Sequence, residues 1–197
     1  MQSTIPGEAE VSKNEIEAVV AEVKAGDKQK YKIIILQFER QMYTYCYYIL
    51  KNHTETEDAV QEIFIRAYEN IHQYSRQVSF SAWLYKMAYH HLINMKKKQS
   101  RWLKLVEHVQ EQQPTLQISQ SEPVVYELLN YLTAEERHIL LLKAVEQYTF
   151  DEISEIMGLK SATIRKKYER LRRKLMERIS QRGEMKHGTL VGTNGIR

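Results

Sequence analysis

The amino-acid sequence predicts an all-α protein, made of two helical domains joined by a flexible linker. Three observations favour this fold class. Apolar residues recur at helical spacing over residues 14–100 and again from Val124 onward. The 197 residues include only seven glycines and three prolines, which is too few for a β-rich chain with many turns. Thr and Glu recur at the spacing of a capping box, a reciprocal hydrogen bond that starts a helix.

The domain organisation follows from where this periodicity stops. A stretch rich in Gln, Ser and Pro, "VEHVQEQQPTLQISQSEP", indicates a linker. The final stretch, "RGEMKHGTLVGTNGIR", holds four of the seven glycines, and residues 1 to about 12 are polar, so disorder is expected at both ends. We expect a partly disordered N-terminal extension (1–24), a first domain (25–101), a linker (102–123), a second domain (124–180) and a flexible tail (181–197).

The first domain is predicted to contain at least three helices. One covers roughly Tyr31 to Leu50. The next is expected to start at a capping box formed by Thr54 and Glu57, because each side chain can satisfy a free backbone N–H of the other. A break at "YSRQVSF" precedes a third helix, which Ser79 or Ser81 can cap and which runs to about residue 98.

The second domain is predicted to contain a helix-turn-helix. Capping boxes begin at Thr133 and at Thr149, each with a Glu three residues later. Gly158 supplies the left-handed residue that ends the helix from Thr149, and Ser161 is expected to cap the helix that follows. A helix, a glycine turn and a second helix form the motif that places its second helix in the major groove of DNA.

The second helix of this motif is strongly basic. Between Lys160 and Arg178 there are nine Lys or Arg residues against two Glu. Apolar residues at core spacing leave the cations outside, where they can neutralise phosphates. The alternative is a solvated amphipathic helix, or one that binds an acidic protein. The expected core positions are Ile164, Tyr168, Leu171 and Leu175, and the candidates for contact with base edges are Ser161, Ala162, Thr163, Arg165 and Lys166.

A second basic segment lies at the end of the first domain. From Lys86 to Lys104 there are six cations and no acid. Aromatic and amide side chains on the same helix suit melted nucleic acid, because exposed bases stack on aromatic rings. The alternative is that Trp83 and Met87 belong to the core and the lysines are solvated, and spacing alone does not decide between the two. The aromatic and polar residues concerned are Trp83, Tyr85, Tyr89, His90 and Asn94.

An acidic stripe marks the preceding helix. Asp58, Glu62 and Glu69 share one face of it. By itself such a stripe indicates only a solvated surface.

Several function classes are not favoured. The sequence has no HExxH, no phosphate-binding glycine loop and no nucleophile elbow, and its seven histidines are scattered, so we expect no enzyme, no cofactor and no metal site. The single cysteine, Cys46, excludes an internal disulfide and reads as a small buried thiol. No apolar run is long enough to span a bilayer, and the polar start does not resemble a signal peptide. We expect a soluble, cytoplasmic protein.

Four blocks carry a resemblance to a known family. They read "EDAVQEIFIRAY" (57–68), "FSAWLYKMA" (80–88), "LTAEERHILLL" (132–142) and "FDEISEIMGLKSATIRKKYERLRRKL" (150–175). Their order and separation resemble the extracytoplasmic-function (ECF) sigma factors, over roughly residues 25 to 180. The resemblance implies a transcription initiation factor that binds core RNA polymerase and promoter DNA, and it suggests an anti-sigma protein as a further partner.

The resemblance also implies roles for particular residues. The acidic helix would dock on polymerase, the loop and basic helix after it would read and melt the −10 element, and the helix-turn-helix would read the −35 element. The implied polymerase-binding residues are Asp58, Gln61 and Glu62. The implied −10 residues are Tyr74, Arg76, Phe80, Trp83, Lys86, His90, Asn94, Lys97 and Lys98. The implied −35 residues are Ser161, Ala162, Thr163, Arg165, Lys166, Lys167 and Arg170.

The chain departs from the family pattern at both DNA-reading segments. His90 and Asn94 stand where the family commonly has Asn and Asp, so the preferred −10 bases are expected to differ. Ala162, Lys166 and Lys167 replace a glycine, a serine and an arginine in the second domain. The alternative function is a stand-alone helix-turn-helix regulator that binds duplex DNA without polymerase. The acidic helix and the "AWLYKMA" block favour the sigma factor, because a sensor domain needs neither.

Overall fold

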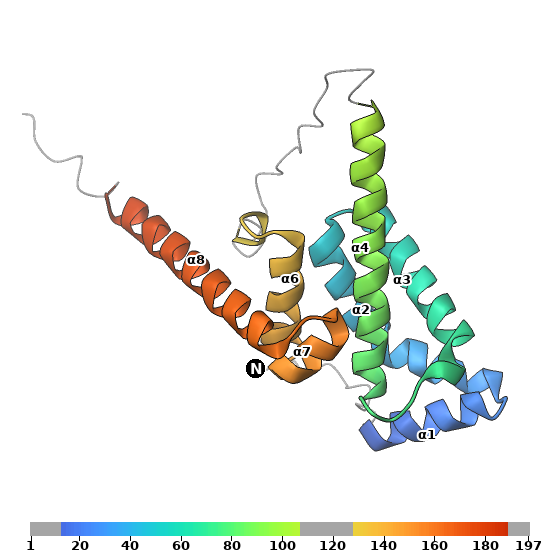
Figure 1. Ribbon diagram of the computed structural model, residues 1–197. Coiled ribbons are helices and arrows are strands. Elements are labelled where there is room, and N and C mark those ends of the chain that lie inside the picture. Colours follow the sequence, from blue (N-terminus) through green and yellow to red (C-terminus); the bar gives the residue numbers. More distant parts are fainter. Residues whose placement is uncertain (1–12, 107–127, 189–197) are drawn as a thin grey trace, which may run out of the picture. The chain divides into compact units, whose positions relative to one another are not determined.

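The computed structural model describes residues 13–106 and 128–188, and every regular element in these two ranges is a helix (Figure 1). The all-α prediction with two helical domains is confirmed. The first 12 residues, most of the predicted linker and the last nine residues lie outside the described ranges. The first domain contains α1 (Lys13–Lys24), the short η1 (Lys28–Lys30), α2 (Tyr31–Leu50), α3 (His53–Glu69), η2 (Ile71–Gln73) and α4 (Phe80–Val106).

Helix α2 forms the centre of the first domain, and α1, α3 and α4 all contact it (Figure 1). Its inward stripe is fully buried, as the period of an amphipathic helix requires. The Tyr45 ring meets Tyr85 of α4 edge to face at 5.0 Å, and the Tyr31 hydroxyl donates to the backbone carbonyl of Phe64 on α3 at 2.7 Å. The α2 side chains with no exposed surface are Ile34, Met42, Cys46 and Ile49.

Helix α1 packs on α2 and α4, although the sequence analysis placed its residues in the N-terminal extension. Ile16, Val20 and Val23 form its buried stripe, each at most 5% exposed. Three apolar residues on a helix of three turns are a weak signal in a sequence, because the pattern does not show which other element the helix packs against.

The ends of α3 and α4 differ in detail from the sequence prediction. Asn52 is the N-cap of α3, where its side chain accepts a hydrogen bond from Glu55 N at 3.0 Å, so the expected capping box at Thr54 is wrong. For α4, Ser79 provides the side-chain acceptor, from Ala82 N at 3.3 Å. Helix α4 then continues to Val106, past the predicted end near residue 98.

The single thiol lies inside this core. Cys46 has no exposed surface, and burial raises the pKa of its thiol to about 12. The prediction of a small buried thiol is therefore confirmed.

The second domain contains α6 (Ala134–Leu140), a π-helical turn η3 (Leu141–Val145), α7 (Phe150–Met157) and α8 (Ser161–Gly188). Both predicted capping boxes are present. Thr133 and Thr149 each accept from the backbone of a Glu three residues on, whose carboxylate accepts in return. Helix α8 extends to Gly188, so residues 181–188 are helical where a flexible tail was predicted.

The core of the second domain is small and includes one histidine. His138 on α6 is fully buried, and this burial, with the nearby charge of Arg137 as a smaller cause, lowers the pKa of its imidazole to about 3. The folded domain therefore holds His138 neutral at any pH near 7. The apolar residues buried with it include Leu129, Ile139, Leu142, Ile164 and Leu171.

The cap of α3 gives a stability test. Asn52→Ala should lower the free energy of unfolding of the first domain by about 1 kcal/mol, because a helix N–H loses its acceptor. Thr54→Ala should change it by less than about 0.5 kcal/mol. Both tryptophans, Trp83 and Trp102, lie in α4, so urea unfolding followed by tryptophan fluorescence reports on this domain. A larger loss for Thr54→Ala would restore the sequence-predicted cap.

Burial of His138 predicts a pH-dependent stability of the second domain. The unfolded chain takes up a proton at His138 near pH 6.5, whereas the folded chain resists it down to a pKa of about 3. The stability that neutral His138 contributes to the folded domain is therefore fully present above pH 6.5. It falls as the pH drops below that value, with a slope of about 1.4 kcal/mol per pH unit for one proton. Urea titrations at several pH values, followed by NMR signals of α6 and α8, measure this slope. In His138→Leu the slope should be smaller by the contribution of one proton, about 1.4 kcal/mol per pH unit. Equal slopes in both proteins would contradict the assignment.

Candidate nucleic-acid and polymerase interfaces

The turn between α7 and α8 has the geometry of a helix-turn-helix. Gly158 ends α7 with a left-handed backbone (φ 67°), which costs glycine little because it lacks a Cβ. The Ser154 hydroxyl donates to the carbonyl of Leu159 at 2.6 Å and fixes the turn. Helix α8 begins at Ser161, and the carbonyl of Lys160 accepts its first hydrogen bonds. Ser161 is thus the first residue of the helix rather than its cap.

Helix α8 turns one face to its own domain and leaves the other open. Ile164 and Leu171 are fully buried, as predicted, while Tyr168 and Leu175 are half-buried at the edge of the core. The ring of Tyr168 meets Phe150 of α7 edge to face at 5.6 Å. The predicted DNA-contacting residues that are exposed on α8 are Ala162, Thr163, Arg165, Lys166 and Arg170.

The cations of α8 fall into two groups. Lys167, predicted to contact DNA, pairs with Glu135 of α6 at 2.8 Å, and Lys174 pairs with Glu136 at 3.4 Å. These two lysines hold α8 against α6. In contrast, neither Lys166 nor Arg170 forms an ion pair with the side chains that the structure describes, those of residues 14–101 and 128–180, so their charge is available to an anionic partner.

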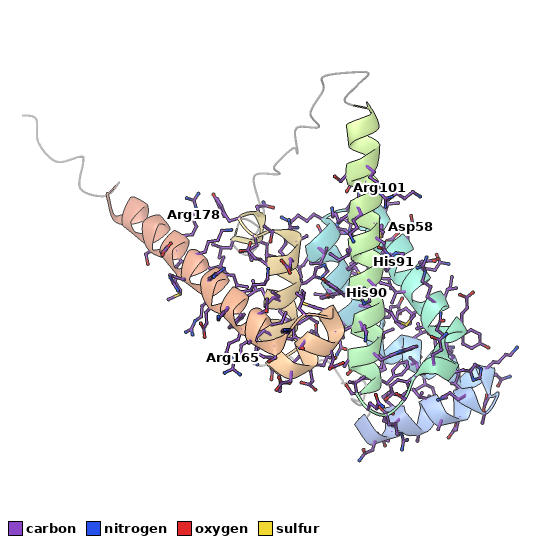
Figure 2. All side chains as sticks on the ribbon, in the orientation of Figure 1. Asp58, His90, His91, Arg101, Arg165 and Arg178 are labelled. Carbon is purple, nitrogen blue, oxygen red and sulfur yellow. The ribbon has the colours of Figure 1, made fainter. Side chains whose placement is uncertain are left out.

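Two arginines of α8 stack on aromatic rings. The Arg165 guanidinium lies 5.2 Å from the centre of the Phe150 ring, and Arg178 lies over Tyr131 at 4.1 Å. Figure 2 shows Arg165 near the start of α8 and Arg178 further along it. Stacking restricts Arg165 at the leading end of α8, where a helix-turn-helix contacts base edges.

One face of α4 carries the predicted residues for melted DNA. Trp83, Lys86, His90 and Asn94 line a single groove between α3 and α4. Their spacing of three and four residues places them above one another on the helix. Burial, together with the charge of Lys86, lowers the pKa of His90. The site is therefore an aromatic ring with neutral and cationic hydrogen-bonding groups, which suits stacked bases and phosphates.

The same groove is also lined by His91 of α4 and by polar residues from α3 and η2 that were missed by sequence reasoning. These polar residues are Arg66, Asn70 and Gln73, from the end of α3 and from η2. Their helical spacing of four and three residues was visible in the sequence, but nothing there indicated that this face meets α4. Lys97 and Lys98 are exposed further along α4.

Two of the predicted −10 residues are in the core. Tyr74 and Phe80 are 3% and 1% exposed, and their rings pack edge to face at 5.3 Å. The half-buried Trp83 packs on both, at 5.6 and 5.5 Å. Burial makes Tyr74 and Phe80 supports for the neighbouring residues rather than surfaces for DNA. Arg76, between them in sequence, has a side chain that is 68% exposed.

The predicted polymerase-binding residues lie on the outer surface of α3. Asp58 is exposed (Figure 2), and so is Gln61. Glu62 accepts a hydrogen bond from Arg66 Nε at 2.6 Å, and this bond lowers the pKa of the Glu62 carboxyl. Gln61 also lines a groove between α2 and α3, beside Ile65, whose side chain is 45% exposed. The acidic and amide groups of α3 thus border partly apolar surface.

No cluster of three or more His, Cys, Asp or Glu with the geometry of a metal site occurs in the described parts of the chain. None of the helices in those parts is both long and apolar enough to cross a membrane.

These features define a DNA-binding protein with a helix-turn-helix in one helical domain and a second candidate nucleic-acid surface in the other. Residues 34–101 match the family Sigma-70 region 2, and residues 124–175 match Sigma-70 region 4. Together the two matches span more than half of the chain. The chain belongs to the extracytoplasmic-function subfamily of sigma factors, and it is a transcription initiation factor that directs RNA polymerase.

Curated relatives agree with this family. The ECF RNA polymerase sigma factor SigW of Bacillus subtilis (strain 168) is 27% identical over 177 residues, which cover 81% of this chain and 94% of SigW. SigX of the same strain is 24% identical, covering 85% of this chain and 99% of SigX. The ECF sigma-E factor of Haemophilus influenzae (strain ATCC 51907 / DSM 11121 / KW20 / Rd) is 23% identical, and the match covers 83% of this chain and 94% of that sigma factor.

Two solved structures share the fold. CnrH, solved in complex with the cytosolic domain of CnrY, has a TM-score of 0.64 at 16% identity, over 83% of this chain and 96% of CnrH. The sigma factor RpoE from Bartonella quintana, solved with the anti-sigma factor NepR, has a TM-score of 0.65 at 18% identity, over 77% of this chain and 98% of RpoE.

The two groups of cations on α8 predict different salt effects. Lys166→Ala should reduce the slope of log binding constant against log salt by about one, because one phosphate contact is lost. Lys167→Ala should change it less, since Glu135 already neutralises Lys167. Fluorescence anisotropy of a labelled random-sequence duplex with the full chain measures both. Equal reductions would mean that Lys167 contacts DNA and does not remain paired with α6.

Proposed function

We propose a division of labour in which the first domain binds core RNA polymerase and reads and melts the −10 element, while the helix-turn-helix reads the −35 element as duplex. One observation supports it above others: a single chain carries two surfaces of different chemistry, each of which suits a different form of nucleic acid. The groove on α4 combines Trp83 with polar and cationic groups, which suits unpaired bases. The leading end of α8 exposes small and cationic side chains, which suit a major groove.

Polymerase docking is assigned to α3. Asp58, Gln61 and Glu62 lie on its outer surface, and the partly exposed Ile65 adds apolar area beside them. A sigma factor must contact polymerase on a surface that leaves its DNA-reading residues open. Asp58 and Gln61 meet this requirement, because neither lines the groove of Lys86, His90 and Asn94. Glu62 borders that groove through its bond to Arg66.

We also assign the protein to the cytoplasm, without catalytic activity of its own, and propose an anti-sigma protein as its regulator. RpoE of Bartonella quintana, which shares the fold, was solved with such a protein. A regulator of this kind acts by covering surfaces that polymerase or DNA needs.

The central experiment is reconstitution of the purified chain with bacterial core RNA polymerase, followed by transcription from a library of genomic promoters. Tight binding to core, and transcripts from a small promoter set with shared −10 and −35 elements, is the expected result. Saturable binding to duplex DNA with no affinity for core polymerase would overturn the proposal in favour of a stand-alone regulator.

Charge reversal on α3 tests the docking surface. Asp58→Lys combined with Glu62→Lys should weaken binding to core polymerase by at least about 100-fold. The two new positive charges would face a polymerase surface that complements acidic groups, and like charges repel. Glu22→Lys is the matched control, since Glu22 is an exposed carboxylate on α1 that pairs with Lys30, and it should bind normally. Binding is measured by titrating labelled core polymerase, with circular dichroism to check helicity. Unchanged affinity of a folded double variant would remove α3 from the interface.

A further inference from the structure

Two side chains of α1 hold both ends of the loop that precedes α4, residues 74–79. The Lys24 ammonium donates to the backbone carbonyl of Tyr74 at 2.8 Å. Glu17 Oε1 accepts from the Tyr74 hydroxyl at 2.7 Å and from the backbone N–H of Phe80, the first residue of α4, at 3.0 Å. Figure 1 shows α1 beside the start of α4. Hydrogen bonds from residues about 50 to 60 positions earlier in the chain therefore restrain both ends of this loop.

Glu17 also holds the exposed cation of this loop. Its Oε2 lies 3.4 Å from Arg76 Nε, and the Arg76 side chain is 68% exposed while that of Glu17 is only 14% exposed. A carboxylate that is shielded from water in this way makes stronger charge-assisted hydrogen bonds than one on the surface. One carboxylate thus restrains a tyrosine, an arginine and a helix start together.

The helix start matters because it sets the orientation of the α4 residues that follow. A carboxylate at the N-terminus of a helix satisfies a free N–H and interacts favourably with the helix dipole. The Tyr74 ring that Glu17 fixes lies 5.6 Å from the ring of Trp83. Displacing Glu17 would therefore move both Arg76, within the loop, and Trp83, on the helix that follows it, and both residues are assigned to the −10 element.

We propose that Glu17 is a positioning residue for −10 recognition, and that α1 is the element through which the chain sets the shape of its −10 surface. The proposal rests on the proposed function of loop 74–79 and α4. Glu17 itself contacts no DNA. It acts through Tyr74, Arg76 and the backbone of Phe80.

The test uses holoenzyme assembled from the full chain and bacterial core polymerase, on promoters that keep the selected −35 element and carry a randomised −10 element. The variants are Glu17→Ala, Glu17→Gln and Tyr74→Phe. The last removes the hydroxyl but keeps the packed ring. Glu22→Ala is the matched control, because Glu22 lies on the same helix and pairs with Lys30 at 3.1 Å, away from the loop. The readouts are base preference at each −10 position, affinity for core polymerase, and urea unfolding by tryptophan fluorescence.

Glu17→Ala should lower transcription from the preferred −10 element by at least about tenfold and flatten the base preference, because a misplaced contact loses most of its value. Glu17→Gln should keep part of the preference, since an amide oxygen can still accept from Tyr74 and Phe80 but has no charge for Arg76. Tyr74→Phe should shift the preference in the same direction. Affinity for core polymerase should stay within about twofold of wild type in every variant, as it should for the control.

A folded Glu17→Ala protein that keeps the wild-type base preference overturns the proposal. If Glu17→Ala does not fold, an unchanged preference in Tyr74→Phe overturns it equally. Absence of any −10 preference in the wild-type holoenzyme would instead refute the proposed function, and the role of Glu17 with it. The two failures are therefore told apart by the wild-type profile alone.

Discussion

Burial of α2 is the constraint on which the first domain depends. Three helices cover it, and each can bury only the one stripe of side chains that faces inward. Fully buried residues such as Ile34, Met42 and Ile49 fix the distance between the helices, since interiors are close-packed. The opposite faces of α3 and α4 are then left to water. The acidic surface of α3 and the groove face of α4 are thus consequences of the same packing.

The second domain meets this constraint with less apolar surface. Its long helix α8 buries few residues fully, Ile164 and Leu171 among them. Ion pairs from Lys167 and Lys174 to α6 supplement this contact at the margin. A basic helix can therefore use some of its cations to stay attached to its own domain while others remain for an outside partner. Sequence distance does not separate the two groups, because Lys166 and Lys167 are neighbours.

Local signals in the sequence predicted what depends on neighbouring residues. The capping boxes at Thr133 and Thr149 and the left-handed Gly158 are all present, because each is a hydrogen bond or a backbone angle set within a few residues. Asn52 and Thr54 are both favourable N-cap residues and lie two positions apart. Which of them caps α3 depends on where the chain leaves α2 and the next helix begins.

Features that depend on distant partners could not be predicted in the same way. The membership of α1 in the first domain rests on a stripe of three residues whose partner the sequence does not name. Tyr74 and Phe80 are aromatic residues beside a cation, which is equally typical of a DNA surface and of a core, and only their burial distinguishes the two. The pairing of Lys167 with Glu135, 32 residues away, has no local signature.

The buried thiol of Cys46 has a consequence for how the protein can be observed. Thiol reagents and oxidants react with the thiolate, and burial keeps this sulfur both protonated and out of reach. Because the chain has one cysteine, chemical labelling at that atom reports a single event, the separation of α2 from the helices around it. The natural chain thus contains a site-specific probe for opening of its first domain, and the same burial shields its transcriptional function from direct oxidation of a cysteine.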